Sequence, residues 1–323
     1  MRFFLLALCL SAFSVGLWAD CPDYTTPSNP PSFSKPTKRN FRNFGNFGNT
    51  ILAGLYVPYH MVYDTIVKSG TNASMVGKFD YDAVFHKDLE GEYVHVYIYG
   101  TAMSGWTYVG RYTTNGDGKI TAILGVRATG DYIVRMVVEG DLSSADGYLT
   151  VADPGRQTVL FDVDGTLTTN DFEALADYSG IKIADAYYYA SETVNAYRNK
   201  GYQIVYLTGR PYWNTKDTRE WFPIKGMRSW HYHPSSDYWG ANVQAYKTDY
   251  INYLRNIVGL DIIRAYGNAT TDIAAYAAGG IPKSDTWIIG ENAGKEGTQS
   301  ITGNYSLHYN TVVASTPQSS SCY

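Results

Sequence analysis

Two aspartates separated by a single residue, Asp162 and Asp164, lie at the end of an apolar stretch, residues 158–163. The stretch predicts a buried strand, and because side chains alternate along a strand, both carboxylates point to the same side. Carboxylates this close repel each other, and a bound Mg²⁺ would relieve that repulsion. One can attack phosphorus to form an aspartyl phosphate, while the other donates a proton to the leaving alkoxide. The pair predicts phosphoryl transfer, with Gly165 allowing a tight turn around the phosphate.

A second apolar stretch, residues 202–207, ends in Thr208 and Gly209. Ligands of an open parallel sheet bind beyond the carboxyl ends of its strands, so these two residues are expected close to the aspartate pair. Arg210 comes next, and it can either reach a phosphate or pair with a carboxylate.

Two later segments add a cation and another carboxylate. Lys247 lies near the start of a predicted helix, residues 242–258. The predicted strand 262–266 is followed by Asn268 and Asp272, which places Asp272 at the same edge of the sheet as the aspartate pair.

These segments resemble, in order, the four motifs of the haloacid dehalogenase (HAD) phosphatase superfamily. More narrowly, they resemble the LNS2 domain shared by lipins and the Nir/rdgB-type phosphatidylinositol-transfer proteins. Upstream, residues 130–141 are similar to the β-sandwich that precedes this domain in the Nir-type proteins. The narrower match rests on segments 161–171, 206–211, 233–236, 247–250, 265–268, 272–276, 279–282 and 287–289.

The resemblance implies a role for each matched residue. Asp162 would be the nucleophile and a Mg²⁺ ligand, and Asp164 the general acid and base, binding Mg²⁺ through its backbone carbonyl. Asp272 would complete the metal site. At position 268 the wider superfamily has an acidic residue. The lipin-like group has an asparagine there, as this sequence does with Asn268. The phosphoryl oxygens would be held by Thr208, Gly209 and Lys247.

The resemblance implies a Mg²⁺-dependent phosphomonoesterase that works through an aspartyl phosphate. The short stretch between Asp164 and Thr208 leaves little room for a cap domain, and an open site suits a substrate such as phosphatidate in a membrane. Some Nir-type relatives lack the first aspartate and bind phosphatidate without turnover. A non-catalytic phosphatidate-binding module is therefore an alternative, and a secreted interaction protein is another.

The elements that position these groups form two predicted domains. Short β-branched and aromatic strands over residues 48–155 predict an immunoglobulin-like β-sandwich, in which residues 107–113 and 119–124 form a hairpin. Alternating strands and helices over residues 156–300 predict a Rossmann-like parallel sheet of the HAD type with little or no cap. Residues 301–323 are expected to be a C-terminal tail.

The first residues predict export. Residues 1–19 have the pattern of a secretory signal peptide, and the Pro- and Ser-rich residues 20–47 read as a linker. We therefore expect a secreted protein, extracellular or periplasmic, with no transmembrane segment after cleavage. In an oxidising compartment the two remaining cysteines, Cys21 and Cys322, would pair in a disulfide.

Composition excludes other classes. Of the 323 residues, 45% are hydrophobic and 17% charged, which argues against a disordered chain. The net charge of −4 offers no basic excess for a nucleic acid backbone.

Overall fold

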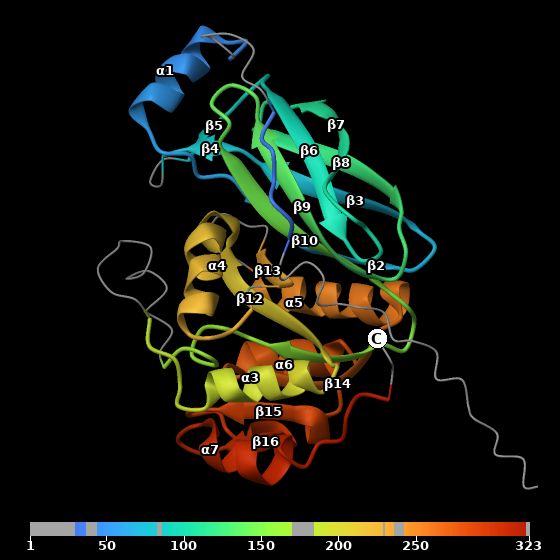
Figure 1. Cartoon of the computed structure of the whole chain (residues 1–323). Helices are drawn as coiled ribbons and strands as arrows, with labels where there is room; N and C mark the ends of the chain where they lie inside the picture. Colours follow the sequence, from blue (N-terminus) through green and yellow to red (C-terminus); the bar gives the residue numbers. More distant parts are fainter. Residues whose placement is uncertain are drawn as a thin grey trace, which may run out of the picture.

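The computed structural model describes residues 30–36, 44–82, 86–169, 184–228, 230–235 and 242–320. Within them the chain forms a β-sandwich followed by an α/β domain, and the two pack against each other (Figure 1). Both predicted fold classes, and their order along the chain, are confirmed.

Short antiparallel strands build the sandwich. Its main sheets have the strand orders β1-β3-β8 and β2-β10-β9-β6-β7, and β4 pairs with β5. The strands are β1 (Met61–Val62), β2 (Thr65–Lys68), β3 (Asn72–Lys78), β4 (Asp80–Tyr81), β5 (Lys87–Asp88), β6 (Tyr93–Gly100), β7 (Thr107–Thr113), β8 (Lys119–Val126), β9 (Gly130–Val138) and β10 (Ser144–Ala152). Only β10 and β2 pair in parallel within these sheets. The core lies between the two main sheets, because every second residue of β6 and β8 is apolar and buried.

The predicted hairpin of residues 107–113 and 119–124 is wrong. The strand β7 pairs with β6, whereas β8 pairs with β3 in the opposite sheet. The Asn115 side chain accepts hydrogen bonds from the backbone N–H groups of Asp117 and Lys119, at 3.0 and 2.8 Å. This turn carries the chain across the sandwich, so a turn sequence that is common in hairpins here connects two sheets.

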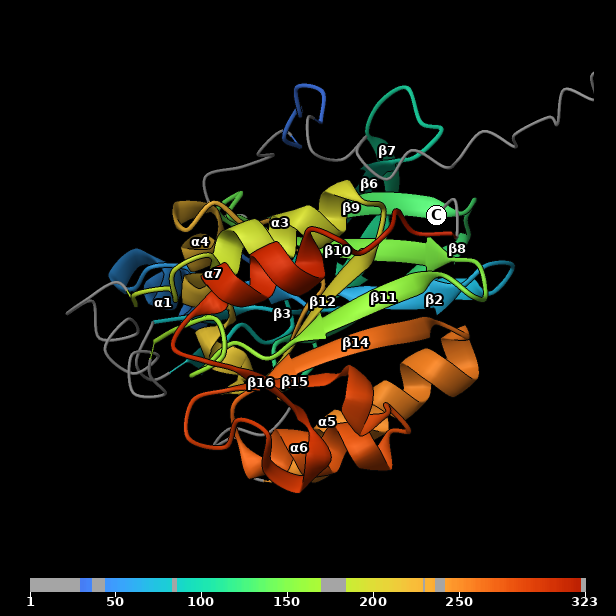
Figure 2. The ribbon, with the colours of Figure 1, turned by 90° about the horizontal axis from the view of Figure 1, so that it is seen from below.

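A six-stranded parallel sheet forms the centre of the α/β domain (Figure 2). Its order is β13-β12-β11-β14-β15-β16, and each neighbouring pair is parallel. The central position of β11 puts the aspartate pair in the middle of the sheet edge. The strands are β11 (Gln157–Phe161), β12 (Gln203–Pro211), β13 (Tyr232–Ser235), β14 (Asp261–Gly267), β15 (Thr286–Ile289) and β16 (Gln299–Ile301).

Helices cover both faces of this sheet (Figure 2). Phe161 and Tyr206 pack towards one group of helices, while Leu160 and Val205, one residue before them, pack towards the other. The first group is α3 (Ala190–Asn199), α4 (Thr215–Ile224) and α7 (Tyr305–His308); the second is α5 (Val243–Asn252), extended by a π-helical turn (Tyr253–Val258), and α6 (Thr270–Ala278). Short helical turns are Tyr212–Asn214, Lys283–Asp285, Lys295–Gly297 and Tyr309–Val313.

Two boundaries differ from expectation. Helix α1 (Phe47–Leu55) begins at the last residue of the predicted linker and precedes the sandwich strands. The expected tail, residues 301–323, is part of the α/β domain over its described residues, because Tyr305 lies fully buried in the core.

One buried carboxylate joins the two domains. Asp64, in the sandwich loop between β1 and β2, accepts a 2.6 Å hydrogen bond from the Arg219 guanidinium of α4. It also accepts backbone N–H bonds from Tyr148 in β10, at 2.7 Å, and from Tyr232 in β13, at 3.0 Å. Burial raises the pKa of Asp64, against the pull of Arg219 and the two N–H groups. The sandwich is thus fixed to α4 and to the edge strand of the sheet.

Candidate functional site

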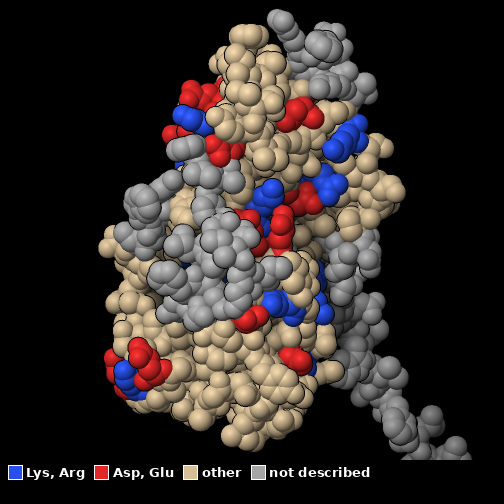
Figure 3. Space-filling model, turned by 90° about the vertical axis from the view of Figure 1, so that its left-hand side faces the viewer, with Lys and Arg blue, Asp and Glu red and all other residues tan. Residues whose placement is uncertain are grey.

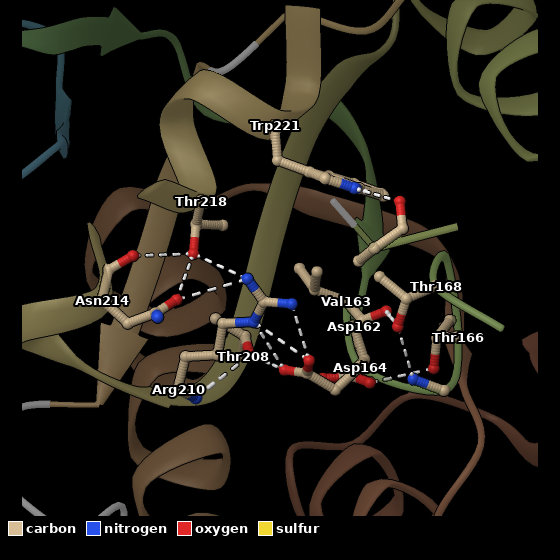
Figure 4. A network of polar contacts seen from close by, with 12 residues as sticks. Asp162, Val163, Asp164, Thr166, Thr168, Thr208, Arg210, Asn214, Thr218 and Trp221 are labelled. Atoms are coloured by element: carbon tan, nitrogen blue, oxygen red, sulfur yellow. Dashed lines mark hydrogen bonds and ion pairs between the residues drawn. The ribbon is translucent and has the colours of Figure 1, made fainter. Parts of the chain in front are cut away.

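The carboxyl ends of the central strands bring the expected site residues together. Asp162 and Asp164 follow β11, Thr208 lies near the end of β12, and Asp272 lies in the first turn of α6 after β14. Lys247 reaches the same place from the first half of α5. The chain segments are far apart in sequence, and the parallel sheet is what makes them neighbours; Figure 4 shows Asp162, Asp164 and Thr208 close together.

A buried cation lies between two of the carboxylates. Lys247 Nζ donates to Asp162 Oδ1 and to Asp272 Oδ1, at 2.6 Å in both cases. All three side chains are nearly inaccessible to solvent. Burial raises the pKa of Asp162 to about 7, against the pull of Lys247 and with further contributions from Asp272 and Asp164. Burial would lower the pKa of Lys247, but the two carboxylates raise it above its ordinary value.

The second aspartate is held by a guanidinium fork. Arg210 donates from Nε and Nη2 to the Asp164 carboxylate at 2.7 to 3.0 Å, and Thr208 Oγ1 donates to it at 3.2 Å (Figure 4). Arg210 Nη1 donates in turn to Asn214 Oδ1 and to Thr218 Oγ1. Of the two roles open to Arg210, the structure shows the pairing with a carboxylate.

The loop after β11 is fixed by short polar side chains that sequence reasoning did not single out. Thr166 Oγ1 donates to Asp162 Oδ2 at 2.9 Å and lies 3.3 Å from Asn268 Oδ1. Gly165 has a φ of 65° and donates its N–H to Thr168 Oγ1, so a side chain here would be strained. The signal for Thr166 was present, since a hydroxyl four residues after a nucleophile candidate can reach back to it.

Asp272 also organises the start of α6. Its Oδ2 accepts the backbone N–H groups of Asn268 and Ala269, both at 3.1 Å, while Oδ1 takes the Lys247 ammonium. Both carboxylate oxygens are therefore engaged by donors. Gly209 contributes differently: a Cβ there would come within 2.9 Å of the Val243 side chain. Its lack of a side chain lets β12 pack closely on α5.

The site carries more negative than positive charge. Three carboxylates, from Asp162, Asp164 and Asp272, face two cations, from Lys247 and Arg210. Carboxylate oxygens are the donors that Mg²⁺ prefers, so this donor set fits the ion. However, within the residues that the structure describes, no three carboxylate, imidazole or thiol groups gather to hold a metal by themselves, since Lys247 stands between two of the carboxylates.

Comparison with known families matches both domains. Residues 159–290 match the model of the LNS2 domain of PITM 1-3, and residues 58–151 match that of the PITM 1-3 β-sandwich domain. The first region contains the aspartate pair, Lys247 and Asp272. The second contains Asp64 and Tyr148.

Full-length relatives are much longer than this chain. The human "Membrane-associated phosphatidylinositol transfer protein 1" is 32% identical over 243 residues, covering 72% of this chain and 18% of that protein. The mouse "Membrane-associated phosphatidylinositol transfer protein 3" is 30% identical over 272 residues, covering 79% of this chain and 26% of that protein. In Drosophila melanogaster, "Protein retinal degeneration B" is 29% identical over 241 residues, covering 72% and 18%.

These names correct one expectation and leave others as predictions. The expected secreted localisation is contradicted, because the relatives are named as membrane-associated proteins. The expected signal peptide, Cys21 and Cys322 all lie outside the described residues. Among the described residues, no helix has the length and apolar character needed to cross a bilayer.

Proposed function

The chain joins a PITM-type β-sandwich domain to an LNS2 domain, and on this premise we propose that its strand-end site binds the phosphomonoester headgroup of phosphatidate at a membrane surface. The relatives are named for a phospholipid, and the site offers hydroxyl and cationic groups suited to a phosphate. Binding, rather than turnover, is the primary proposal because of how Asp164 is held.

The contact between the Arg210 guanidinium and the Asp164 carboxylate favours binding over turnover. A general acid must bring a proton to the leaving group, but the donors that contact Asp164, two guanidinium nitrogens and the Thr208 hydroxyl, all point at its carboxylate oxygens. Arg210 is held in place by Asn214 and Thr218, so it does not swing away without breaking those bonds. The arrangement supports a site that holds a phosphate rather than one ready to protonate an alkoxide.

Charge balance makes the proposed binding dependent on Mg²⁺. A phosphomonoester dianion entering beside three carboxylates and two cations meets net negative charge. A divalent cation held by Asp162, Asp272 and the Asp164 backbone carbonyl would supply the missing positive charge. The chain's own residues would then position the headgroup, with Thr208 and Lys247 at its oxygens.

The test compares phosphatidylcholine vesicles that contain either phosphatidate or phosphatidylserine at matched surface charge. Mg²⁺-dependent sedimentation with phosphatidate, reduced by EDTA and by Asp162→Asn, is expected. Equal binding to both anionic lipids would contradict recognition of the phosphomonoester. Because general anionic attraction is screened by salt, the comparison is made at physiological ionic strength.

Hydrolysis of the same phosphomonoester is the second candidate, and the position of Asp162 favours it. One oxygen of Asp162 contacts Lys247 and the other contacts Thr166, an arrangement that orients a nucleophile. Its carboxylate would attack phosphorus as the ester P–O bond breaks, and water would then release phosphate. The alkoxide must take a proton from Asp164, so Arg210 has to release that side chain first. Phosphate release that disappears in Asp162→Asn would establish turnover.

Helix α1 offers an apolar contact with a membrane. Phe47, Ile51 and Leu55 are spaced by four residues and are 63%, 48% and 71% exposed, and the helix projects as a region free of Lys, Arg, Asp and Glu at the top of Figure 3. Leu55→Asp is expected to weaken binding to phosphatidate vesicles by roughly tenfold or more, because a buried leucine is worth about 1.5–3 kcal/mol. Sedimentation assays measure this.

The matched control for that change is Leu307→Asp in α7, where the leucine is 66% exposed on the α/β domain. It makes the same substitution far from α1 along the chain and should leave vesicle binding unchanged. Equal losses in both variants would show that added negative charge, and not the loss of an apolar contact, is responsible.

A further inference from the structure

The described segment 30–36 lies across the outer face of the sandwich as a thin blue trace in front of the strands (Figure 1). It reads Pro-Pro-Ser-Phe-Ser-Lys-Pro and forms neither helix nor strand. Side chains of the five-stranded sheet and its loops hold it there. We call the residues that contact it, Tyr97, Trp106 and Arg135, the aromatic face.

A single aromatic anchor seats the segment. The Phe33 ring lies 5.0 Å from the ring of Tyr97 and 5.2 Å from that of Trp106, edge-on in both cases. The Arg135 guanidinium lies 4.9 Å from the centres of both the Phe33 and Trp106 rings. Edge-on rings and a stacked guanidinium are favourable geometries, so the three residues of the aromatic face together bind one phenyl ring.

Polar contacts fix the backbone of the segment beside this anchor. The Trp106 indole N–H donates to the Pro31 carbonyl at 3.0 Å. Lys35 Nζ donates to the Leu142 carbonyl at 3.2 Å. Proline-rich segments are recognised in general by docking on aromatic side chains, and here a tryptophan both lies beside such a segment and donates to its backbone.

Contacts within the sandwich hold the side chains of the aromatic face in place. Arg135 is held by a bidentate pair with Asp146, with both bonds at 2.7 Å, and Tyr97 packs on Tyr108 at 5.2 Å. The segment, in contrast, exposes most of its residues and is tethered to the sandwich at Phe44, whose ring packs on Gly140. A face whose side chains are held by the sandwich, and which a tethered segment contacts, has the arrangement of a site that can exchange that segment.

We propose that the aromatic face is a binding site for proline-rich segments that carry a phenylalanine, and that residues 30–36 occupy it in cis. A partner segment of the same chemistry would bind by displacing them. A short tether gives the cis segment an effective concentration in the millimolar range, so an isolated peptide competes poorly until the cis anchor is removed.

The experiment uses the full chain and a fluorescent peptide with the sequence of residues 30–36. Phe33→Ala should remove the ring that occupies the aromatic face. By fluorescence anisotropy, this variant should bind the peptide at least ~10-fold more tightly than the wild-type chain does. Adding Trp106→Ala to Phe33→Ala should remove that gain. Tyr188→Ala, which deletes an aromatic side chain that is 66% exposed on the α/β domain, is the matched control and should bind as the wild type does.

Chymotrypsin cleavage after Phe33 gives a second readout that needs no added peptide. Docking protects this bond, so Trp106→Ala alone should speed cleavage there, while cleavage after Phe47 is unchanged. The proposal is overturned if Phe33→Ala binds the peptide no better than the wild-type chain, or if Trp106→Ala leaves both peptide binding and cleavage unaltered.

Discussion

Asp64→Ala is expected to reduce the free energy of unfolding by about 3–5 kcal/mol, the cost of removing one partner from a buried ion pair. Arg219 would lose its charged partner in a buried setting, and the N–H groups of Tyr148 and Tyr232 would lose their acceptor. Because these donors come from both domains, the loss should also loosen the contact between them. Urea unfolding followed by far-UV circular dichroism measures the change.

Asp117→Ala provides the matched control. Asp117 pairs with Lys119 at 3.9 Å within the sandwich alone, and the two side chains are 72% and 42% exposed. Its removal should cost no more than about 1 kcal/mol. A similar cost for both substitutions would mean that the pair between the domains contributes no more than an exposed one.

Lys247→Met is expected to have the second large effect, a loss of about 3–5 kcal/mol at pH 8. The substitution leaves Asp162 and Asp272 buried and facing each other without their shared cation. Lys283→Met, which breaks an exposed pair with Glu296, is the control and should change the free energy of unfolding by less than about 1 kcal/mol.

The Lys247 variant should regain stability on acidification. The folded pKa of Asp162 is already raised to about 7, above its unfolded value, and losing the cation removes the interaction that opposes this rise. A carboxyl with a raised folded pKa binds protons more readily in the folded state, so its contribution to stability grows as pH falls from 8 towards 6. Urea midpoints at these two pH values test the sign, and a lower midpoint at pH 6 would contradict it.

Mg²⁺ gives an independent check on the same variant. With Lys247 replaced, two carboxylates share a space that a divalent cation can enter, so millimolar Mg²⁺ should raise the urea midpoint of Lys247→Met. No response to Mg²⁺ would argue against a metal site at Asp162 and Asp272, and would count against the Mg²⁺ dependence of the proposed function.

Features that depend on local pattern could be predicted from the sequence. The apolar run before Asp162 is a central parallel strand because successive residues, Leu160 and Phe161, are both apolar and face different helix layers. Lys247 and Asp272 follow from their places after predicted elements, since parallel strands end at one edge.

Features that depend on distant contacts could not be predicted. The partners of Asp64 include Tyr232, which is 168 positions away, and nothing near Asp64 in the sequence marks it as a joint between domains. The Asn115 turn is compatible with both a hairpin and a crossing between sheets, and only the pairing of β8 with β3 decides it. The sequence allows two roles for Arg210, because the partner of its guanidinium depends on the contacts with Asn214 and Thr218.

The order in which the ribosome releases the chain matters for this site. The Tyr305 hydroxyl donates to the Thr166 carbonyl at 3.0 Å, so the loop that carries the aspartate pair receives a buried partner from far downstream. The sandwich lies entirely upstream of β11 and can fold as soon as it emerges, whereas the α/β domain must wait until Tyr305 leaves the exit tunnel. Nascent chains arrested before this residue should therefore display a folded sandwich beside an incompletely formed loop at the aspartate pair.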